Sequence, residues 1–189
     1  MTQWLADKAV LHAAEAARAG GIIAYPTEAV WGLGADPDNS QALARLLALK
    51  GRPKAKGLIL IAANTAQLEP WLATLSVAAR AQLEATWPGP VTWLVPNNKL
   101  ASEWITGDFT TVALRVTDHP VAQALCLNFG GPLVSTSANP LGQAPARTRA
   151  QVKHYFESQL QAIAPGCVGA RAQPSEIRDL QTGRILRPG

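Results

Sequence analysis

The sequence predicts a single α/β domain built around a mixed sheet. Helix-like and strand-like segments alternate along the 189 residues, the pattern of chains that pack helices on the faces of a sheet. The hydrophobic content of 48% and the charged content of 16% are those of a globular chain with a real core rather than of a disordered one. No linker, low-complexity tract or internal repeat is visible, so residues 1–189 are expected to form one domain.

Two helices and a strand are predicted in the N-terminal quarter. Apolar residues recur on one face of 7–19, and the glycine pair that follows ends this helix. Ile22 to Tyr25 is a short buried strand that ends at Pro26. Ser40 is a candidate N-cap for a second helix, whose inner face carries leucines and whose last turn carries Lys50.

The middle of the chain adds three strands and a helix. The run 58–62 is continuously apolar, as in a strand that is covered on both faces. A helix fits 77–86, and strands fit 91–95 and 111–116.

The C-terminal third continues the alternation. A helix over 118–129 has Pro120 in its cap region, and a strand follows over 132–135. A helix over 148–158 is capped by its first residue, a threonine. The segment 181–183 is a turn within a terminal hairpin.

Composition excludes several classes of protein. No apolar run approaches the roughly 18 residues of a membrane span, and the N-terminus does not resemble a signal peptide. Cys126 and Cys167 are far apart and are interpreted as two reduced thiols, which favours a cytoplasmic location. His12, His119 and His154 lack metal-ligand spacing, so we predict no protein-held metal.

The basic residues are clustered although the net charge is only +4. No acidic residue occurs over 39–68 or over 119–156. Both stretches are rich in cations, namely Arg45, Lys50, Arg52, Lys54 and Lys56 in the first and Arg147, Arg149 and Lys153 in the second. Such clusters suit nucleotide phosphates or a nucleic-acid backbone, and a solvated basic face is the alternative.

Two polar segments near the N-terminus are candidates for a site, although GxxxxGK[ST], GxSxG and a complete dinucleotide fingerprint are absent. Thr27 and Glu28 directly follow a buried strand, where α/β sheets form ligand sites; simple capping of the next turn is the alternative. In 50–57, Pro53 and Gly57 exclude a continuous helix. Its cations therefore lie on a shaped loop that can wrap a polyphosphate, or that is simply solvated.

Two further segments combine strands with polar groups. Thr111, Ala113 and Arg115 share one face of a strand, where a buried arginine is costly unless an anion meets it. A bound anion and a salt bridge to Asp118 or Glu28 are both open for Arg115. The hydroxyls and amide of 135–140 follow a buried strand and suit a phosphate or an amino-acid carboxylate better than capping alone.

At these residues the chain closely resembles the YrdC family of threonylcarbamoyl-adenylate synthases, also called TsaC. The family signature, KxR followed much later by SxN, is present as 50–52 and 137–139. Other matching pieces follow in the same order: Pro26-Thr27-Glu28, Gly32-Leu33-Gly34, 87–92, 115–120 and 174–179. Each piece is weakly specific, but the ordered set covers nearly the whole chain.

The resemblance implies a single-domain fold, with a twisted mixed sheet flanked by helices and a large electropositive cleft. It implies ATP contacts, with Lys50 and Arg52 clamping the triphosphate and Arg115 pairing with the threonine carboxylate. The implied ATP-binding residues are Lys50, Arg52, Thr111, Ser137, Asn139 and Arg187. The implied threonine-binding residues are Thr27, Lys56, Arg115, Ser135 and Ser175.

The implied reaction joins L-threonine, bicarbonate or carbon dioxide, and ATP into threonylcarbamoyl-AMP and pyrophosphate, the first step toward a modified tRNA adenosine. Mg²⁺ is expected with ATP, held largely by ATP oxygens and water. Expected partners are the tRNA threonylcarbamoyltransferase proteins that act next. The rival interpretation is RNA binding without catalysis, supported by the pI of about 9.4 and by six tryptophans that could stack on bases.

Overall fold

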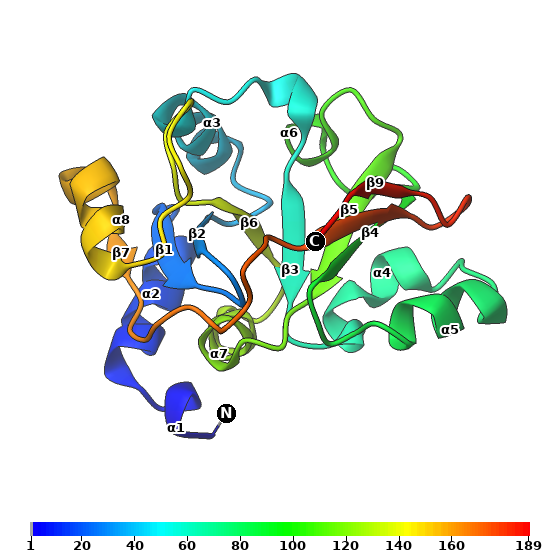
Figure 1. The fold of residues 1–189 in the computed structure, drawn as a ribbon, viewed down its shortest axis with the longest axis horizontal. Helices are drawn as coiled ribbons and strands as arrows, with labels where there is room; N and C mark the ends of the chain where they lie inside the picture. The colour runs from blue at the N-terminus through cyan, green and yellow to red at the C-terminus, as the bar shows by residue number, and fades with distance from the viewer. Residues whose placement is uncertain (1) are drawn as a thin grey trace.

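The computed structural model describes residues 2–189 and places a mixed sheet at the centre of the molecule (Figure 1). Within this range the sheet has nine strands in the order β7-β1-β2-β6-β3-β5-β4-β8-β9. The strands are β1 (Ile23–Pro26), β2 (Trp31–Gly34), β3 (Ile59–Ala62), β4 (Val91–Pro96), β5 (Thr111–Val116), β6 (Leu133–Ser137), β7 (Ala162–Ile163), β8 (Glu176–Asp179) and β9 (Ile185–Arg187). The helices are α1 (Thr2–Leu5), α2 (Lys8–Arg18), α3 (Ser40–Lys50), α4 (Glu69–Leu72), α5 (Val77–Glu84), α6 (Glu103–Thr106), α7 (Pro120–Phe129) and α8 (Arg149–Phe156).

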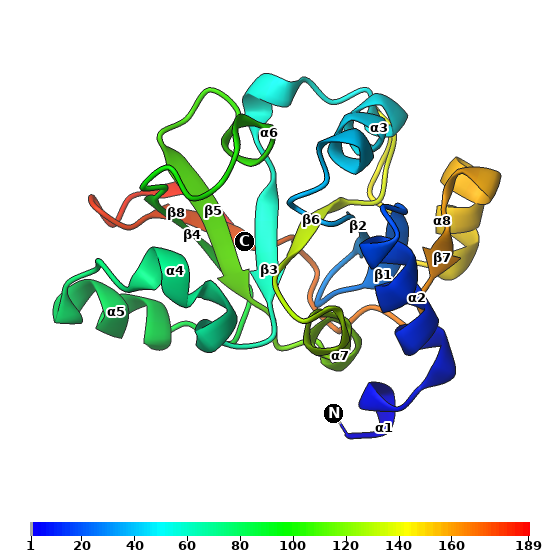
Figure 2. The same cartoon turned by 180° about the vertical axis from the view of Figure 1, so that it is seen from behind.

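The pairing of the strands is mixed, as the sequence predicts. β1 pairs with β7, β3 with β5, and β4 with β8 in parallel. The remaining neighbours pair antiparallel, including β6 with both β2 and β3. Figures 1 and 2 show α8 and β7 at one end of the sheet and α4 and α5 at the other.

The two faces of the sheet pack against different helices. Ile61 and Leu133, register partners on β3 and β6, lie in a cluster with apolar residues of α2 and α7. Leu60 and Leu114, register partners on β3 and β5, belong to the larger cluster with leucines of α3, α4 and α5. Because successive side chains of a strand point to opposite faces, the strands β1, β3 and β6 contribute to both clusters.

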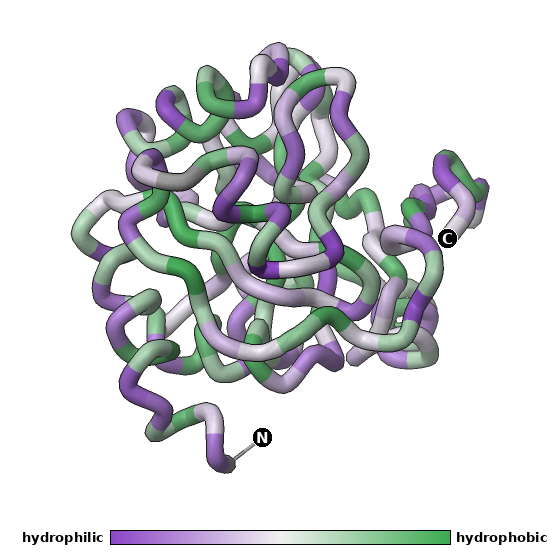
Figure 3. The backbone as a smooth tube through the Cα atoms, turned by 60° about the vertical axis from the view of Figure 1, so that its left-hand side comes forward, coloured by the Kyte–Doolittle hydropathy of each residue, from purple (hydrophilic) through white to green (hydrophobic). Residues whose placement is uncertain are grey.

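Helix α2 shows why the local sequence folds as predicted. The Asp7 carboxylate accepts hydrogen bonds from the backbone N–H groups of Ala9 (2.8 Å) and Val10 (3.1 Å), which caps the helix. Its apolar positions are buried, and green and purple stretches alternate along the helices in Figure 3. A helix with one buried face needs this alternation, so the predicted amphipathic pattern is confirmed.

The ends of other elements differ in detail from the prediction. The N-cap of α3 is Asn39, whose side chain accepts from the Ala42 N–H at 2.9 Å, so the assignment of this cap to Ser40 was wrong by one residue. Thr148 does cap α8, since its hydroxyl accepts from the Gln151 N–H at 3.1 Å. The strand β2 was not predicted, because two of its four residues are glycine and give no strand signal.

Two connections complete the walls around one face of the sheet. The short helix α6 lies near the N-terminal ends of β3 and β5. In Figure 1 the orange stretch between β7 and β8 runs from one end of the sheet toward the other and leads into Ser175. The β8–β9 hairpin that follows confirms the predicted terminal turn, with Gly183 at a φ of 69°.

Candidate active site

A cavity of about 480 Å³ lies on one face of the sheet. Residues of β2, β3, β5 and β6 form its floor, and Leu186 and Arg187 of β9 close one side. Its walls come from the turn 27–30, the basic loop 52–58 and the segment 173–175. Several chain segments that are far apart in the sequence therefore meet around one space.

Strand alternation explains which polar groups reach the cavity. Thr111, Ala113 and Arg115 all line it, which confirms the prediction that these three residues share one face of their strand. Ser135 and Ser137, two residues apart on β6, line it as well. The small Ala113 leaves room between the larger side chains.

Most of the predicted site residues come together here. The residues of that set that line the cavity are Thr27, Arg52, Lys56, Thr111, Arg115, Ser135, Ser137, Ser175 and Arg187. Lys50 and Asn139 do not line it. The structure therefore brings nine of the eleven predicted residues around one cavity, and their roles in binding stay predictions.

Arg52 is fixed by the loop on which it stands. Its guanidinium donates to the carbonyl of Gly57 at 2.9 and 3.2 Å and to that of Lys56 at 3.2 Å. Gly57 has a φ of 59°, which lets the loop curve back to offer these carbonyls. Burial holds the pKa of Arg52 below its ordinary value, yet an arginine remains charged at neutral pH.

The Lys50 ammonium is bonded behind the cavity lining rather than forming part of it. It donates to the carbonyl of Ser137 and, at 2.8 Å, to that of Asn139, and the side chain is buried. Burial first, and then the neighbouring Arg52, lower the pKa of Lys50 to about 8. Lys50 of the KxR element thus contacts the backbone of the SxN element, which differs from the expected triphosphate clamp. Direct contact of Lys50 with ATP stays a prediction.

Replacing Lys50 by methionine should therefore loosen the 137–139 turn. The Asn139 carbonyl loses its donor and the Ser137 carbonyl keeps only the Asn139 N–H, at 3.0 Å, a loss that typically costs about 1 kcal/mol of unfolding free energy. Urea unfolding of both proteins measures this loss directly. An unchanged midpoint and slope would contradict the assigned contact.

The 137–139 turn is held mainly by its own polar groups. The Ser137 hydroxyl and the Asn139 side-chain oxygen are 2.6 Å apart, and the Asn139 amide donates to the Gln143 carbonyl at 2.9 Å. The side chain of Asn139 thus shapes the loop that presents Ser137 to the cavity.

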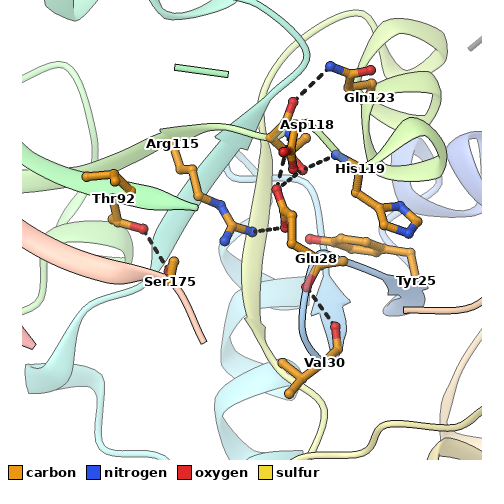
Figure 4. A network of polar contacts seen from close by, with 12 residues as sticks. Tyr25, Glu28, Val30, Thr92, Arg115, Asp118, His119, Gln123 and Ser175 are labelled. Carbon is orange, nitrogen blue, oxygen red and sulfur yellow. Dashed lines mark hydrogen bonds and ion pairs between the residues drawn. The ribbon is translucent and has the colours of Figure 1, made fainter. Parts of the chain in front are cut away.

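Arg115 meets a carboxylate at the edge of the cavity (Figure 4). Its guanidinium lies 3.4 Å from Oε2 of Glu28, and both side chains are buried. The other oxygen of Glu28 accepts from the Thr117 hydroxyl at 2.7 Å and from the Asp118 N–H at 3.1 Å. Of the two carboxylates left open by the sequence, Glu28 is therefore the one that pairs with Arg115, and contact with a bound anion stays a prediction.

The charges of this network influence one another. Burial raises the pKa of Glu28, but Arg115 and the hydrogen bond from Thr117 outweigh it, so the pKa lies below its ordinary value. The pKa of Asp118 is raised, first by burial and then by the neighbouring Glu28 carboxylate. Burial lowers the pKa of His119, whose Nε2 lies 3.0 Å from the Cys167 carbonyl.

The lowered pKa of Glu28 predicts a loss of stability in acid. Because its folded pKa lies below the ordinary 4.5, Glu28 stabilises the fold above about pH 4.5, and this contribution is lost as the pH falls through the folded pKa. Glu28→Gln should be less stable than the wild type at neutral pH, and the difference should shrink in acid. Thermal unfolding at a series of pH values measures it, and a difference independent of pH would contradict this origin.

The far side of the cavity is closed by Arg187. Its guanidinium donates to the carbonyl of Ser175 at 2.5 and 3.1 Å and lies 3.2 Å from the hydroxyl of the same residue. That hydroxyl is also 3.0 Å from the Thr92 hydroxyl. Burial lowers the pKa of Arg187, and the positive charges of Arg115 and Arg52 lower it further.

Sequence reasoning missed the apolar part of the lining. Ile105 and Phe109, at and after α6, and Leu94 on β4 reach the cavity. Gly32 was quoted only as part of a motif, yet it lies on the floor, where a Cβ would be 3.4 Å from the Tyr25 ring and 3.5 Å from the Ser135 hydroxyl. Gly32, the glycine of β2 that lines the cavity, was the available signal for this part of the floor.

The described residues contain neither a cluster of metal ligands nor a membrane-spanning helix. Across residues 2–189, no three His, Cys, Asp or Glu side chains are grouped so that they could hold a metal ion. Over the same residues, no helix has the length and hydropathy needed to cross a membrane.

Fold and site together define an α/β protein with a cation-lined cavity, which suits a ligand that carries phosphates. The chain belongs to the Sua5/YciO/YrdC family, whose model, described as "Telomere recombination", matches residues 15–189. A Cellvibrio japonicus protein named threonylcarbamoyl-AMP synthase is 59% identical, with 100% of each chain covered. The protein of that name from Pseudomonas aeruginosa is 56% identical over 93% of this chain and 95% of its own.

Solved structures agree in fold. P. abyssi Sua5 complexed with L-threonine has a TM-score of 0.89 at 32% identity, covering 95% of this chain and 54% of that one. The chain thus spans about half of that protein. E. coli YciO has a TM-score of 0.84 at 25% identity, with 95% and 88% of the two chains covered.

Proposed function

We propose that this chain is a threonylcarbamoyl-AMP synthase, which makes L-threonylcarbamoyladenylate and pyrophosphate from L-threonine, bicarbonate or carbon dioxide, and ATP. The observation that carries the proposal is the cavity that gathers Arg52, Lys56, Arg115 and Arg187 with several hydroxyl groups. The names of relatives more than half identical over nearly their full length support it. The product is the first intermediate of threonylcarbamoyladenosine in tRNA.

The reaction needs alignment of its reactants more than a protein nucleophile. The threonine amine and bicarbonate form a carbamate with loss of water. A carbamate oxygen then attacks the α-phosphorus of ATP, the bond to the bridging oxygen breaks, and pyrophosphate leaves. Holding the reactants in line and neutralising the leaving group supply most of the catalysis in such transfers.

The proposed roles follow from the positions of the side chains. Arg52, Lys56 and Arg187 face the triphosphate, with Thr111 and Ser137 donating hydrogen bonds to the nucleotide. The Lys56 ammonium, although first assigned to threonine, stands on the same loop as Arg52 and can serve either substrate.

The other end of the cavity is proposed to hold threonine. Arg115 faces the carboxylate, and Thr27, Ser135 and Ser175 line the space around it. P. abyssi Sua5, 32% identical to this chain, has been solved with L-threonine bound. That similarity supports an amino-acid site in the shared fold.

A magnesium ion is proposed to enter with ATP. It would neutralise charge on the phosphates and would be held mainly by ATP oxygens and water, as is usual for Mg²⁺. The hydroxyls of Thr111 and Ser137 are the lining groups whose chemistry suits its outer ligands. No protein cage of carboxylates is needed for this role.

We further propose a cytoplasmic setting, where ATP, tRNA and the next enzymes of the modification are found. RNA binding ranks second, because its structural support is weak: Trp31, Trp87 and Trp93 are buried. Trp4, Trp71 and Trp104 are partly buried. Stacking on bases needs exposed rings.

Pyrophosphate release tests the proposed function. The purified protein should release pyrophosphate from ATP and Mg²⁺ only when both L-threonine and bicarbonate are present. Release that ignores threonine would identify a different reaction. Absence of release together with absence of ATP binding would move RNA binding to first place.

A further inference from the structure

Among the residues that the structure describes, the cavity is lined by more positive than negative side chains, and only one of the positive side chains forms an ion pair. The described lining residues include four cations, Arg52, Lys56, Arg115 and Arg187, and a single carboxylate, Glu28. Within residues 2–189, Arg115 is the one of these cations that forms an ion pair. The charge of Arg115 is therefore matched by a carboxylate inside the described part of the protein, whereas the charges of Arg52, Lys56 and Arg187 are not.

The position of Glu28 commits its charge to Arg115. Its Oε1 is occupied by Thr117 and Asp118, while its Oε2 faces the Arg115 guanidinium and accepts no hydrogen bond from another group of the protein. Figure 4 shows the carboxylate between Arg115 and the start of α7. The lowered pKa described above keeps Glu28 ionised at neutral pH.

Two of the other cations, Arg52 and Arg187, are held by dipoles rather than by charges. Arg52 donates to carbonyls of its own loop, and Arg187 donates to Ser175. Carbonyl groups orient a guanidinium but do not cancel its charge, so its attraction for phosphate persists. A carboxylate beside Arg115, in contrast, repels an incoming phosphate.

We infer that Glu28 is a specificity-determining residue that sorts the two substrates by charge. It keeps the Arg115 end of the cavity neutral overall, which suits a zwitterionic amino acid and rejects free phosphates. The triphosphate is thereby directed to Arg52, Lys56 and Arg187. The inference rests on the proposed function, because it assigns threonine and ATP to the two ends.

A purely structural role for Glu28 makes a different prediction. If the carboxylate only braced the turn 27–30 against α7, loss of any of its hydrogen bonds would weaken the site without changing its preference among anions. Thr117→Val is the matched variant, since it removes the 2.7 Å hydrogen bond to Glu28 and retains the carboxylate.

Calorimetric titration with L-threonine in the absence of ATP provides a readout independent of turnover, with inorganic phosphate as the probe anion. In the wild type, phosphate should leave the affinity for threonine unchanged while it competes with ATP. Phosphate that displaces threonine from the wild type would overturn the inference without any variant, even if Glu28→Gln failed to fold.

Glu28→Gln then supplies the positive test. Phosphate should now compete with threonine, because the carboxylate that repelled phosphate from Arg115 is gone. Thr117→Val should be less stable, yet phosphate should still not compete. Competition in both variants, or in neither, would overturn the inference.

The outcome separates this inference from the proposed function. If the wild type binds threonine but releases no pyrophosphate, the synthase assignment is wrong, while the competition between phosphate and threonine can still be measured. If the wild type turns over but phosphate does not compete with threonine in Glu28→Gln, only the role of Glu28 is wrong.

Discussion

Arg52→Ala is expected to lower kcat/KM about 100-fold or more, which is the usual loss when a positioned donor to transition-state charge is removed. Arg52 is the signature cation that lines the cavity, and its guanidinium is already oriented by the carbonyls of Lys56 and Gly57. The Arg52 side chain is therefore already oriented before ATP binds. Pyrophosphate release at varied ATP and threonine concentrations measures the effect.

Lys54→Ala is the matched control for Arg52→Ala. Lys54 stands on the same loop, but it pairs with Glu103 at 2.8 Å and lies over the Trp104 ring, 4.4 Å from its centroid, outside the cavity. An exposed pair of this kind contributes about 0–1 kcal/mol to stability, so activity should change little. Near-normal turnover by Arg52→Ala, or an equal loss in both variants, would refute the assigned role.

Gly107→Ala is expected to cause the largest loss of stability. Gly107 ends α6 with a φ of 61° and a ψ of −135°, a conformation open essentially only to glycine. A Cβ there would collide with the Ala55 carbonyl and would lie 2.6 Å from the backbone nitrogen of Gly57. Strain and collision together should cost about 3 kcal/mol or more, roughly 6–12 °C in Tm for a domain of this size.

The effect of Gly107→Ala should extend to activity. The basic loop packs on α6 through backbone hydrogen bonds from Leu58 to Ile105 (2.8 Å) and from Asp108 to Ala55 (3.2 Å). A displaced loop carries Arg52 away from its position, so KM for ATP should rise. Thermal unfolding and steady-state kinetics test the two parts separately.

Gly130→Ala distinguishes backbone strain from collision. Gly130 also has a positive φ, 89°, but no atom lies within 4 Å of the position that its Cβ would take. It should cost only about 1 kcal/mol, and it should leave KM for ATP unchanged. Equal losses at Gly107 and Gly130 would show that packing of the loop on α6 is unimportant.

Much of the fold could be predicted because local signals agreed with tertiary packing. The strand Thr111–Val116 has the predicted bounds, since its alternation of small or polar with apolar residues matches a sheet with a cavity on one face and a core on the other. The strand Trp31–Gly34 could not be predicted, because its glycines are there for room. A Cβ at Gly34 would lie 2.7 Å from the Tyr25 ring.

The position of a candidate residue was predictable where the side chain both belonged to a matching family motif and lay on an alternating strand. Arg115 met both conditions, and its pairing with Glu28 was one of the alternatives left open by the sequence. Lys50 met only the first condition, and spacing along the chain does not reveal which way an ammonium points at the end of a helix. The four-residue helix α6 is too short to give a periodic signal, so its part in the cavity emerged only from the structure.

The central claim is that this cavity joins threonine, a one-carbon unit from bicarbonate and AMP into one molecule. Mass spectrometry of the nucleotide products, after incubation with ATP, Mg²⁺, L-threonine and bicarbonate labelled with heavy carbon, tests it most directly. We predict an adenylate with the mass of threonylcarbamoyl-AMP, one mass unit heavier than that from unlabelled bicarbonate. An adenylate without the label, or AMP formed equally well without threonine, would contradict the account.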